Sequence, residues 1–383
     1  MGSEFSDRLL AVPMYASNAV DVYSGVARLS GRIWAREVTL SGSKPKTAAV
    51  FMHPTSNFLG HYLLERTART GVAAIGMCTR YVGNDSALLM ENCVLDVGAT
   101  VAFLRDEGFE NVVLVGNSGG GGLAPLYQAQ AEQPTITSAP GGAGPDLTKA
   151  ALPRADAVIL LNAHPSRALL RTEWLDPALT DEARPFERDA ALDMFRPENG
   201  PPYDEEFMKR YREAQVDRNH RITAWAKERL AEIEQRFGGE LTDFPFVVHG
   251  TTADPRFFDL TIDANDRAYG TTLWGTPQVA NYLPTSLGHF NSARSWLSQW
   301  SIQDSNAGAH NLNSVSVPVL IVTGTGDPTV LPSHTNMFVA NIRHADFKRV
   351  DIPKATHYFE GQPELMDVAA AQIGSWLGEH GLL

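Results

Sequence analysis

The stretch Asn111–Gln130, which reads NVVLVGNSGGGGLAPLYQAQ, joins an apolar run to a helical pattern through one serine and four consecutive glycines. The apolar run Val112–Gly116 is typical of a strand that is buried on both faces of a parallel sheet. Residues 116–120 fit the pattern G-x-S-x-G, in which a sharp turn from strand to helix presents the hydroxyl of the central residue. The turn has room only for neighbours without a Cβ, which explains the glycines. The pattern and its context predict that Ser118 is a nucleophile.

A glycine-rich turn after a strand can also bind phosphate, and an ordinary tight turn is a further alternative. Phosphate loops have the spacing G-x-x-x-x-G-K-[ST] or G-x-G-x-x-G. Neither spacing occurs in residues 116–122, and no lysine follows the glycines. We therefore favour the nucleophile over both alternatives.

Short apolar and β-branched runs recur along the chain and alternate with helical patterns such as Ser86–Glu107 and Leu123–Glu132. This alternation predicts βαβ units and an α/β fold with a doubly wound, mostly parallel sheet. Besides Val112–Gly116, the runs are Arg32–Leu40, Ala48–His53, Val72–Cys78, Ala157–Ala163, Val317–Thr323 and the weaker Phe347–Ile352.

The alternation is interrupted once, between Pro165 and Ser316. A long amphipathic pattern covers Asp204–Phe237 and ends at two glycines, and an aromatic-rich stretch follows it. We predict a core built from residues 6–164 and 317–383, with residues 165–316 inserted after the sixth strand as a mainly helical cap. Residues 1–5, MGSEF, read like a cloning remnant and are left out of the core.

A serine hydroxyl is a weak nucleophile at neutral pH, so it needs a base, and the base needs an acid that orients it. Asp327 lies in the turn TGTGDPT after the run Val317–Thr323, and His357 lies in the loop KATHYF after the last run. The order serine, aspartate, histidine along the chain is the order expected with this type of serine turn. We predict that Ser118, His357 and Asp327 are the catalytic residues.

Two N–H groups are expected to stabilise the oxyanion that forms on the attacked carbonyl. The first is the N–H of Gly119, at a helix start where the helix dipole favours negative charge. The second should come from the loop after the run Ala48–His53. Pro54 has no N–H, so Thr55 or Ser56 must donate, and we favour Thr55. A simple strand-end turn is the alternative interpretation of this loop.

A substrate pocket should be lined by residues close to these positions. The candidates are His53, Ser56, His164 and Trp274. Trp274 belongs to the aromatic-rich stretch of the cap, whose members could equally form a small core of the cap itself. Three arginines of the cap could hold a substrate carboxylate, although surface arginine is the commoner case. They are Arg256, Arg267 and Arg294.

The serine turn, the acid turn and the histidine loop together resemble the α/β-hydrolase superfamily over about Val20–Ser166 and Val317–Leu383. The resemblance implies an eight-stranded, mostly parallel sheet, a triad of serine, aspartate or glutamate, and histidine, and a cap that shapes substrate choice. A serine at position 118 excludes members with an aspartate nucleophile, namely haloalkane dehalogenases and epoxide hydrolases. The chain departs from the superfamily pattern at Pro54, where glycine is common.

The composition and motifs limit which classes of partner the protein is expected to bind. A net charge of −12 with dispersed basic residues argues against nucleic-acid and anionic-membrane partners. No apolar segment has the length of a membrane span, no signal pattern is present, and the two cysteines predict no disulfide framework, so we expect a cytoplasmic protein. No metal cluster or nucleotide motif occurs, so we expect no cofactor and no metal. The predicted partner is a small-molecule substrate, and the oligomeric state stays open, with a homodimer among the options.

The first functional hypothesis is hydrolysis of a carboxylic ester or thioester of a small, apolar or aromatic substrate through an acyl-enzyme. The second is acyl transfer to an alcohol or amine by the same triad. The third is hydrolysis of a carbon–carbon bond in a β-diketone-type substrate. A non-enzymatic binding protein on the same scaffold is disfavoured, because every triad position is filled.

Overall fold

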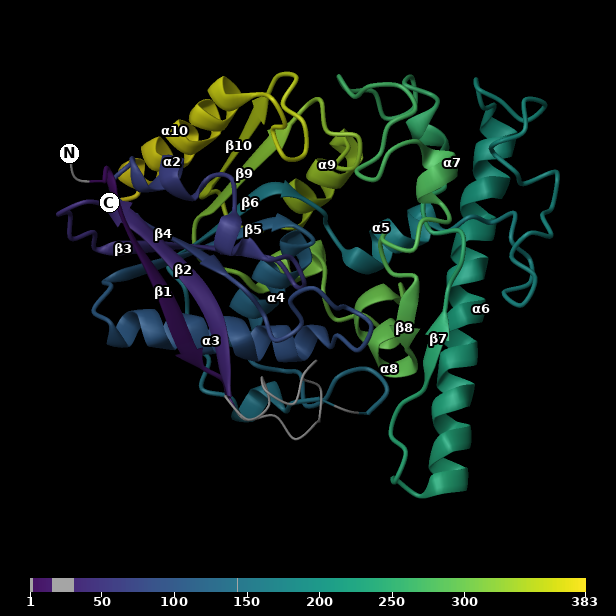
Figure 1. The fold of residues 1–383 in the computed structure, drawn as a ribbon, viewed down its shortest axis with the longest axis horizontal. Helices are drawn as coiled ribbons and strands as arrows, with labels where there is room; N and C mark the ends of the chain where they lie inside the picture. The colour runs from purple at the N-terminus through teal and green to yellow at the C-terminus, as the bar shows by residue number, and fades with distance from the viewer. Residues whose placement is uncertain (1–2, 16–30, 143) are drawn as a thin grey trace.

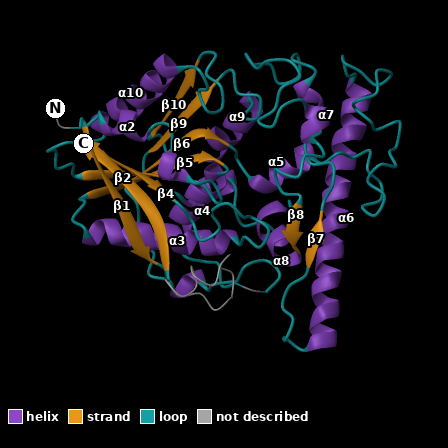
Figure 2. Ribbon diagram, viewed as in Figure 1, coloured by secondary structure: helices purple, strands orange, loops and turns teal. Residues whose placement is uncertain are grey.

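The centre of the molecule is an eight-stranded sheet in the order β1-β2-β4-β3-β5-β6-β9-β10 (Figures 1 and 2), seen in a computed structural model that describes residues 3–15, 31–142 and 144–383. β2 is antiparallel to both neighbours, and the remaining pairs are parallel. The sheet confirms the predicted fold class. The strands are β1 (Phe5–Pro13), β2 (Arg32–Leu40), β3 (Thr47–Met52), β4 (Ala73–Met77), β5 (Asn111–Ser118), β6 (Ala157–Ala163), β9 (Val319–Gly324) and β10 (Phe347–Ile352).

The first strand was not predicted from the sequence. β1 pairs with β2 along its whole length, from Phe5 opposite Leu40 to Pro13 opposite Arg32. Most of its side chains are exposed, so it lacks the apolar run that identifies the inner strands. Phe5, placed in the predicted remnant, is therefore part of the sheet. Met1, Gly2 and the start of the resemblance at Val20 lie outside the described residues.

The inner strands are apolar throughout because each face of the sheet packs on its own core. In β5, Val112 and Leu114 face one core, and Val113 and Val115 face the other. The first core contains residues of α3 (Met90–Asp106), α4 (Gly120–Glu132) and α9 (Pro332–Asn341). The second contains residues of α2 (Leu64–Ala68) and α10 (Pro363–Glu379). The result is a three-layer arrangement with helices on both faces of the sheet (Figure 2).

Two helices begin at other residues than the sequence pattern indicates. α4 begins at Gly120, three residues before the predicted start at Leu123, so it follows the serine turn directly. The sequence pattern did not indicate this helix start, because glycine is a poor helix former. α3 begins at Met90, later than the predicted Ser86, whose N–H donates to the Asn84 side chain in a turn.

The segment predicted as a cap, residues 165–316, which we call the cap below, lies beyond β5 and β6, with α6 at its outer edge (Figure 1). Asp204 caps α6 by accepting the Phe207 N–H at 2.7 Å, and Gly238 ends the helix with a φ of 55°. The cap also contains a short antiparallel strand pair that the sequence did not predict. Its helices and strands are α5 (Arg167–Trp174), α6 (Glu205–Phe237), α7 (Pro277–Ala280), α8 (Ala293–Ser295), β7 (Pro245–Val247) and β8 (Phe290–Ser292), with a π-helical turn at Trp296–Trp300.

The aromatic-rich stretch of the cap serves mainly the cap's own packing. Trp296 and Trp300 are buried with Ile222 of α6 in one apolar cluster, and Phe257 packs in a second. Tyr269 and Phe290 are exposed. The alternative that these aromatics form a core of the cap therefore describes most of them.

Short 3-10 helices complete the fold at Phe58–Gly60, Leu147–Lys149, Pro255–Phe257 and Ala309–Ser314. Cys78 and Cys93 are buried and free. In the described part of the chain, no helix has the length and apolar character that crossing a membrane requires.

Candidate active site

Ser118 lies at the turn between β5 and α4 in a left-handed backbone conformation, with a φ of 54°. For a residue other than glycine this conformation costs about 1–3 kcal/mol, so the surroundings must hold it in place. A Cβ on Gly116 would lie 2.5 Å from the Gly120 carbonyl oxygen, and one on Gly120 would lie 2.2 Å from that of Met52. Neither position can carry a side chain. The strained serine between two obligatory glycines is the geometry that the motif predicts.

The structure brings the three predicted catalytic side chains together. The Nε2 of His357 lies 3.0 Å from the Oγ of Ser118, and its Nδ1 lies 2.6 Å from the Oδ2 of Asp327. The second oxygen of Asp327 accepts the backbone N–H groups of Thr329 and Val330 at 2.7 and 3.0 Å. These bonds orient the carboxylate, which in turn orients the imidazole.

Asn162, the penultimate residue of β6, links the loop that carries His357 to the end of β9. Its Nδ2 donates to the carbonyls of Thr356 and His357 at 3.2 and 2.9 Å, and its Oδ1 accepts the Gly324 N–H at 2.7 Å. Its φ of 39° is also left-handed, which asparagine tolerates better than most residues. The sequence analysis did not single out Asn162, because its partners are more than 160 residues away.

The loop after β3 does not have the hydrogen bonding that we expected. The N–H groups of Thr55 and Ser56 both donate to the Nδ1 of His53, at 3.0 and 2.9 Å. The Thr55 N–H, which we favoured as the second oxyanion donor, is thus engaged within its own loop. This contact could not be read from the sequence, because it depends on how the His53 side chain turns back onto its loop.

A cavity of about 260 Å³ opens directly over Ser118. It contains Gly119 and Thr55, together with all four residues predicted to line a substrate pocket. Its complete lining is His53, Thr55, Ser56, Ser118, Gly119, His164, Arg167, Leu170, Trp174, Leu273, Trp274, Leu287 and Tyr358. A larger cavity of about 510 Å³ lies against α6 and contains none of the three predicted catalytic residues.

Arg167, in the first turn of α5, is the charged residue of the cavity that the sequence analysis missed. It is 2% exposed. Its Nε and Nη2 donate to Gln299, and Nη2 also bonds Asp85 at 3.0 Å. Its guanidinium group stacks over Trp300 at 4.2 Å. Its place three residues after His164, at the carboxyl end of a strand, was the one signal in the sequence.

Two buried histidines close to Ser118, His164 and His61, have lowered pKa values. Burial, and then the neighbouring ring of His357, keep the pKa of His164 well below its usual range. Its ring stacks on that of His357, with centroids 5.6 Å apart. Behind the serine turn, burial lowers the pKa of His61 to about 3, and its Nε2 lies 3.3 Å from the Oδ1 of Asn117.

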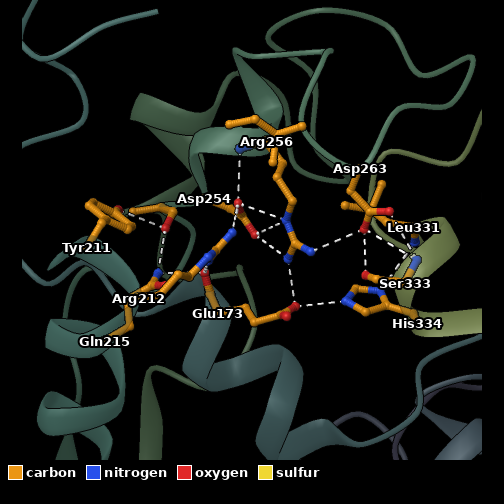
Figure 3. A network of polar contacts seen from close by, with 12 residues as sticks. Glu173, Tyr211, Arg212, Gln215, Asp254, Arg256, Asp263, Leu331, Ser333 and His334 are labelled. Atoms are coloured by element: carbon orange, nitrogen blue, oxygen red, sulfur yellow. Dashed lines mark hydrogen bonds and ion pairs between the residues drawn. The ribbon is translucent and has the colours of Figure 1, made fainter. Parts of the chain in front are cut away.

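A buried polar network connects the cap to α9 (Figure 3). Glu173 of α5 accepts a hydrogen bond from Arg256 at 2.6 Å and lies 2.8 Å from the Nε2 of His334. Asp254 accepts hydrogen bonds from both Arg256 and Arg212. Although burial opposes ionisation, the charge of Arg256 keeps the pKa of Glu173 well below its usual range. Arg256 is thus engaged by carboxylates of the cap segment itself.

The other two arginines considered for carboxylate binding are also engaged elsewhere. Arg267 donates to the backbone carbonyls of Asp259 and Ile262, and Arg294 donates to that of Thr242. Neither these two nor Arg256 lines the cavity over Ser118. Among the described residues, no group of three or more histidine, cysteine, aspartate or glutamate side chains could hold a metal ion.

The strand order and the strained serine turn define an α/β-hydrolase fold. No model of a protein family matches the sequence, and no curated protein matches it either. Among solved structures, the chain is similar to the esterase domain of a Rhodothermus marinus protein, at 12% identity over 97% of this chain and 98% of that one, with a TM-score of 0.47.

Two further solved structures have a similar sequence identity and TM-score. A proline iminopeptidase of Mycobacterium smegmatis has 16% identity over 98% of this chain and 99% of its own, with a TM-score of 0.47. A monoacylglycerol lipase of Paleococcus ferrophilus has 13% identity over 91% of this chain and 99% of its own, with a TM-score of 0.46. The activities in these names belong to those proteins, and the fold assignment rests on the sheet and the turn.

Proposed function

We propose that this protein is a serine hydrolase that cleaves a carboxylic ester or thioester through an acyl-enzyme. One observation carries the proposal: the hydrogen-bonded chain from Ser118 through His357 to Asp327, at 3.0 and 2.6 Å, with Ser118 lining a cavity. A hydroxyl, an imidazole and a buried carboxylate in this order form the arrangement that activates serine for acyl transfer.

In the first half of the reaction, the Oγ of Ser118 attacks the carbonyl carbon while the Nε2 of His357 takes the hydroxyl proton. The carbonyl electron pair moves onto oxygen, and the Gly119 N–H donates to that oxyanion. The tetrahedral intermediate then collapses. The leaving alcohol or thiol departs with the proton from His357, and the acyl group stays on Ser118.

In the second half, water takes the place of the leaving group. His357 removes a proton from the water as its oxygen attacks the acyl carbon, and then returns that proton to the Oγ of Ser118. The products are the free acid and a regenerated serine. Asp327 takes up no proton in this cycle and stabilises the imidazolium that forms twice in it.

The cavity supports a small substrate with an apolar or aromatic acyl group. Its volume of about 260 Å³ lies just below the usual range of about 300–1,000 Å³ for small-molecule sites. One wall is apolar and comes from the cap. This wall is formed by Leu170, Trp174, Leu273, Trp274 and Leu287.

A panel of p-nitrophenyl esters with acetyl, butanoyl, octanoyl and benzoyl groups tests the proposal. The expected result is release of both nitrophenol and free acid in water alone, with the short or benzoyl esters preferred, and no release by Ser118→Ala. Product that forms only after an alcohol or amine is added would replace hydrolysis by acyl transfer. Turnover of a β-diketone panel without ester cleavage would replace it by carbon–carbon bond hydrolysis.

A further inference from the structure

The ring of His53 is held in one orientation and one tautomer by its own loop. Two backbone N–H groups, from Thr55 and Ser56, donate to Nδ1 at 3.0 and 2.9 Å. A nitrogen that accepts two N–H groups carries no proton of its own. The neutral ring therefore has its proton on Nε2.

The environment of His53 keeps this ring neutral. The side chain is buried, and burial is the main reason why its pKa lies well below the usual range. The charge of Arg167 and the ring of His357 act in the same direction. At neutral pH His53 therefore presents a fixed, uncharged N–H donor.

That donor lies beside the turn that carries the nucleophile. A Cβ built on Gly119 would lie 2.8 Å from the Nε2 of His53, so this nitrogen is adjacent to the residue that follows Ser118. His53, Ser118 and Gly119 line the same cavity. Among the described residues, the hydrogen bonds of the His53 ring are the two at Nδ1, and its Nε2 donates to none of them.

We infer that the Nε2–H of His53 is the second donor to the oxyanion, alongside the N–H of Gly119, and that it takes the place of the Thr55 N–H. The inference rests on the proposed hydrolase function. As Ser118 attacks, the carbonyl oxygen gains the electron pair and the hydroxyl proton goes to His357. His53 gains and loses no proton, and only donates a hydrogen bond.

The arrangement suits this task for physical reasons. An oxyanion donor acts best when it is already oriented in a site of low polarity, because no reorganisation is then needed during the reaction. The loop provides that orientation through the two bonds to Nδ1. Pro54, where the superfamily commonly has glycine, precedes the two donating N–H groups.

Two substitutions of His53 separate a catalytic donor from a support of the loop. In asparagine the amide oxygen lies about where Nδ1 lies in histidine, so His53→Asn keeps the acceptor for the loop and loses the donor. In glutamine the amide nitrogen lies about where Nε2 lies, so His53→Gln keeps a donor and loses the acceptor. The experiment measures kcat and KM for a p-nitrophenyl ester, with thermal melting of both variants.

For His53→Asn we expect kcat to fall about 10²–10³-fold with KM changed less than about threefold, as for the loss of one oxyanion donor. We expect His53→Gln to retain at least about ten times more activity than His53→Asn. Equal activities, or the reverse order, would overturn the inference. A wild-type protein that neither cleaves esters nor reacts at Ser118 with a fluorophosphonate would instead overturn the proposed function, and the inference with it.

The wild-type protein provides a second test that does not depend on the variants folding. In histidine labelled with ¹⁵N, we expect the neutral Nε2–H tautomer for His53, and a downfield shift of this proton when a boronic acid forms a tetrahedral adduct with Ser118. A proton on Nδ1, or an Nε2 proton that the adduct leaves unchanged, contradicts the inference.

Discussion

The surroundings of His357 and of His53, two histidines close to the serine turn, differ in their hydrogen bonding. Around His357 and Asp327, both ring nitrogens and both carboxylate oxygens have hydrogen-bond partners within the described residues. Around His53, Nδ1 accepts two N–H groups of the loop, and Nε2 has no hydrogen bond to another described residue. Residues whose hydrogen bonds are all made before a substrate binds are suited to moving a proton. A fixed donor that has no acceptor in the protein is suited to stabilising negative charge on a substrate.

The largest effect on kcat is expected when the hydroxyl of Ser118, the proposed nucleophile, is removed. Ser118→Ala should lower kcat for ester hydrolysis on the order of 10⁶-fold, and His357→Ala nearly as much, because the triad acts as a unit. Steady-state kinetics with matched melting temperatures checks this. A Ser118→Ala protein that retains more than about a hundredth of the activity rules out covalent catalysis by this serine.

A smaller but still large effect is expected from Asp327→Asn. One oxygen of this carboxylate must keep accepting the N–H groups of Thr329 and Val330, so the new amide nitrogen faces the Nδ1 of His357. Two donors then face each other and the imidazole is driven to the wrong tautomer, which should lower kcat about 10⁴-fold. Circular dichroism is the control for folding. A loss below tenfold would show that Asp327 does not orient the base.

Asn162→Gly tests whether the position of His357 depends on the hydrogen bonds that Asn162 makes to its loop. Glycine accepts the left-handed φ of 39° but removes the bonds to the loop of His357 and to Gly324. Misplacement of the imidazole should lower kcat about 10–100-fold, with KM nearly unchanged. A change in KM alone would place Asn162 in substrate binding instead.

The five inner strands β3, β4, β5, β6 and β9 were predictable because their apolar runs are local patterns. The same holds for the grouping of Ser118, His357 and Asp327. A run buried on both faces needs no knowledge of its neighbours, and the turns at Ser118 and Asp327 are specified by adjacent glycines. Strand β1 was not predictable in this way, because its exposed residues gain their place only by pairing with β2.

The less predictable side of the cavity depends on contacts between distant segments. Arg167 reaches the cavity because Gln299, 132 residues further along the chain, holds its guanidinium group. The role that we expected of Thr55 depended on a free backbone N–H, and a side chain two residues away engages it. Side-chain orientation of this kind leaves no periodic signal in a sequence.

The smallest expected effect is a change in the free energy of unfolding with pH, and it tests whether His61, behind the serine turn, is neutral in the folded protein. The pKa of His61 is about 3 in the folded protein and about 6.5 when unfolded. Below pH 6.5 the unfolded state therefore binds a proton that the folded state does not, so stability is lost as the pH falls. The contribution is about 1.4 kcal/mol per pH unit, or about 2 kcal/mol between pH 6.5 and 5.

Urea unfolding across this pH range checks the expectation for His61. His61→Asn, which removes the titrating ring, should show a shallower decline in the free energy of unfolding than the wild type. The same slope in both proteins would mean that this ring is protonated equally easily in the folded and unfolded states.

The central claim is that the hydroxyl of Ser118 is activated by His357 at the floor of the cavity. Mass spectrometry of the intact and digested protein after reaction with a fluorophosphonate tests it most directly. We predict one adduct per chain, located on Ser118, and none in His357→Ala under the same conditions. An adduct on another residue, or an unreacted Ser118 in the folded wild-type protein, would contradict the account.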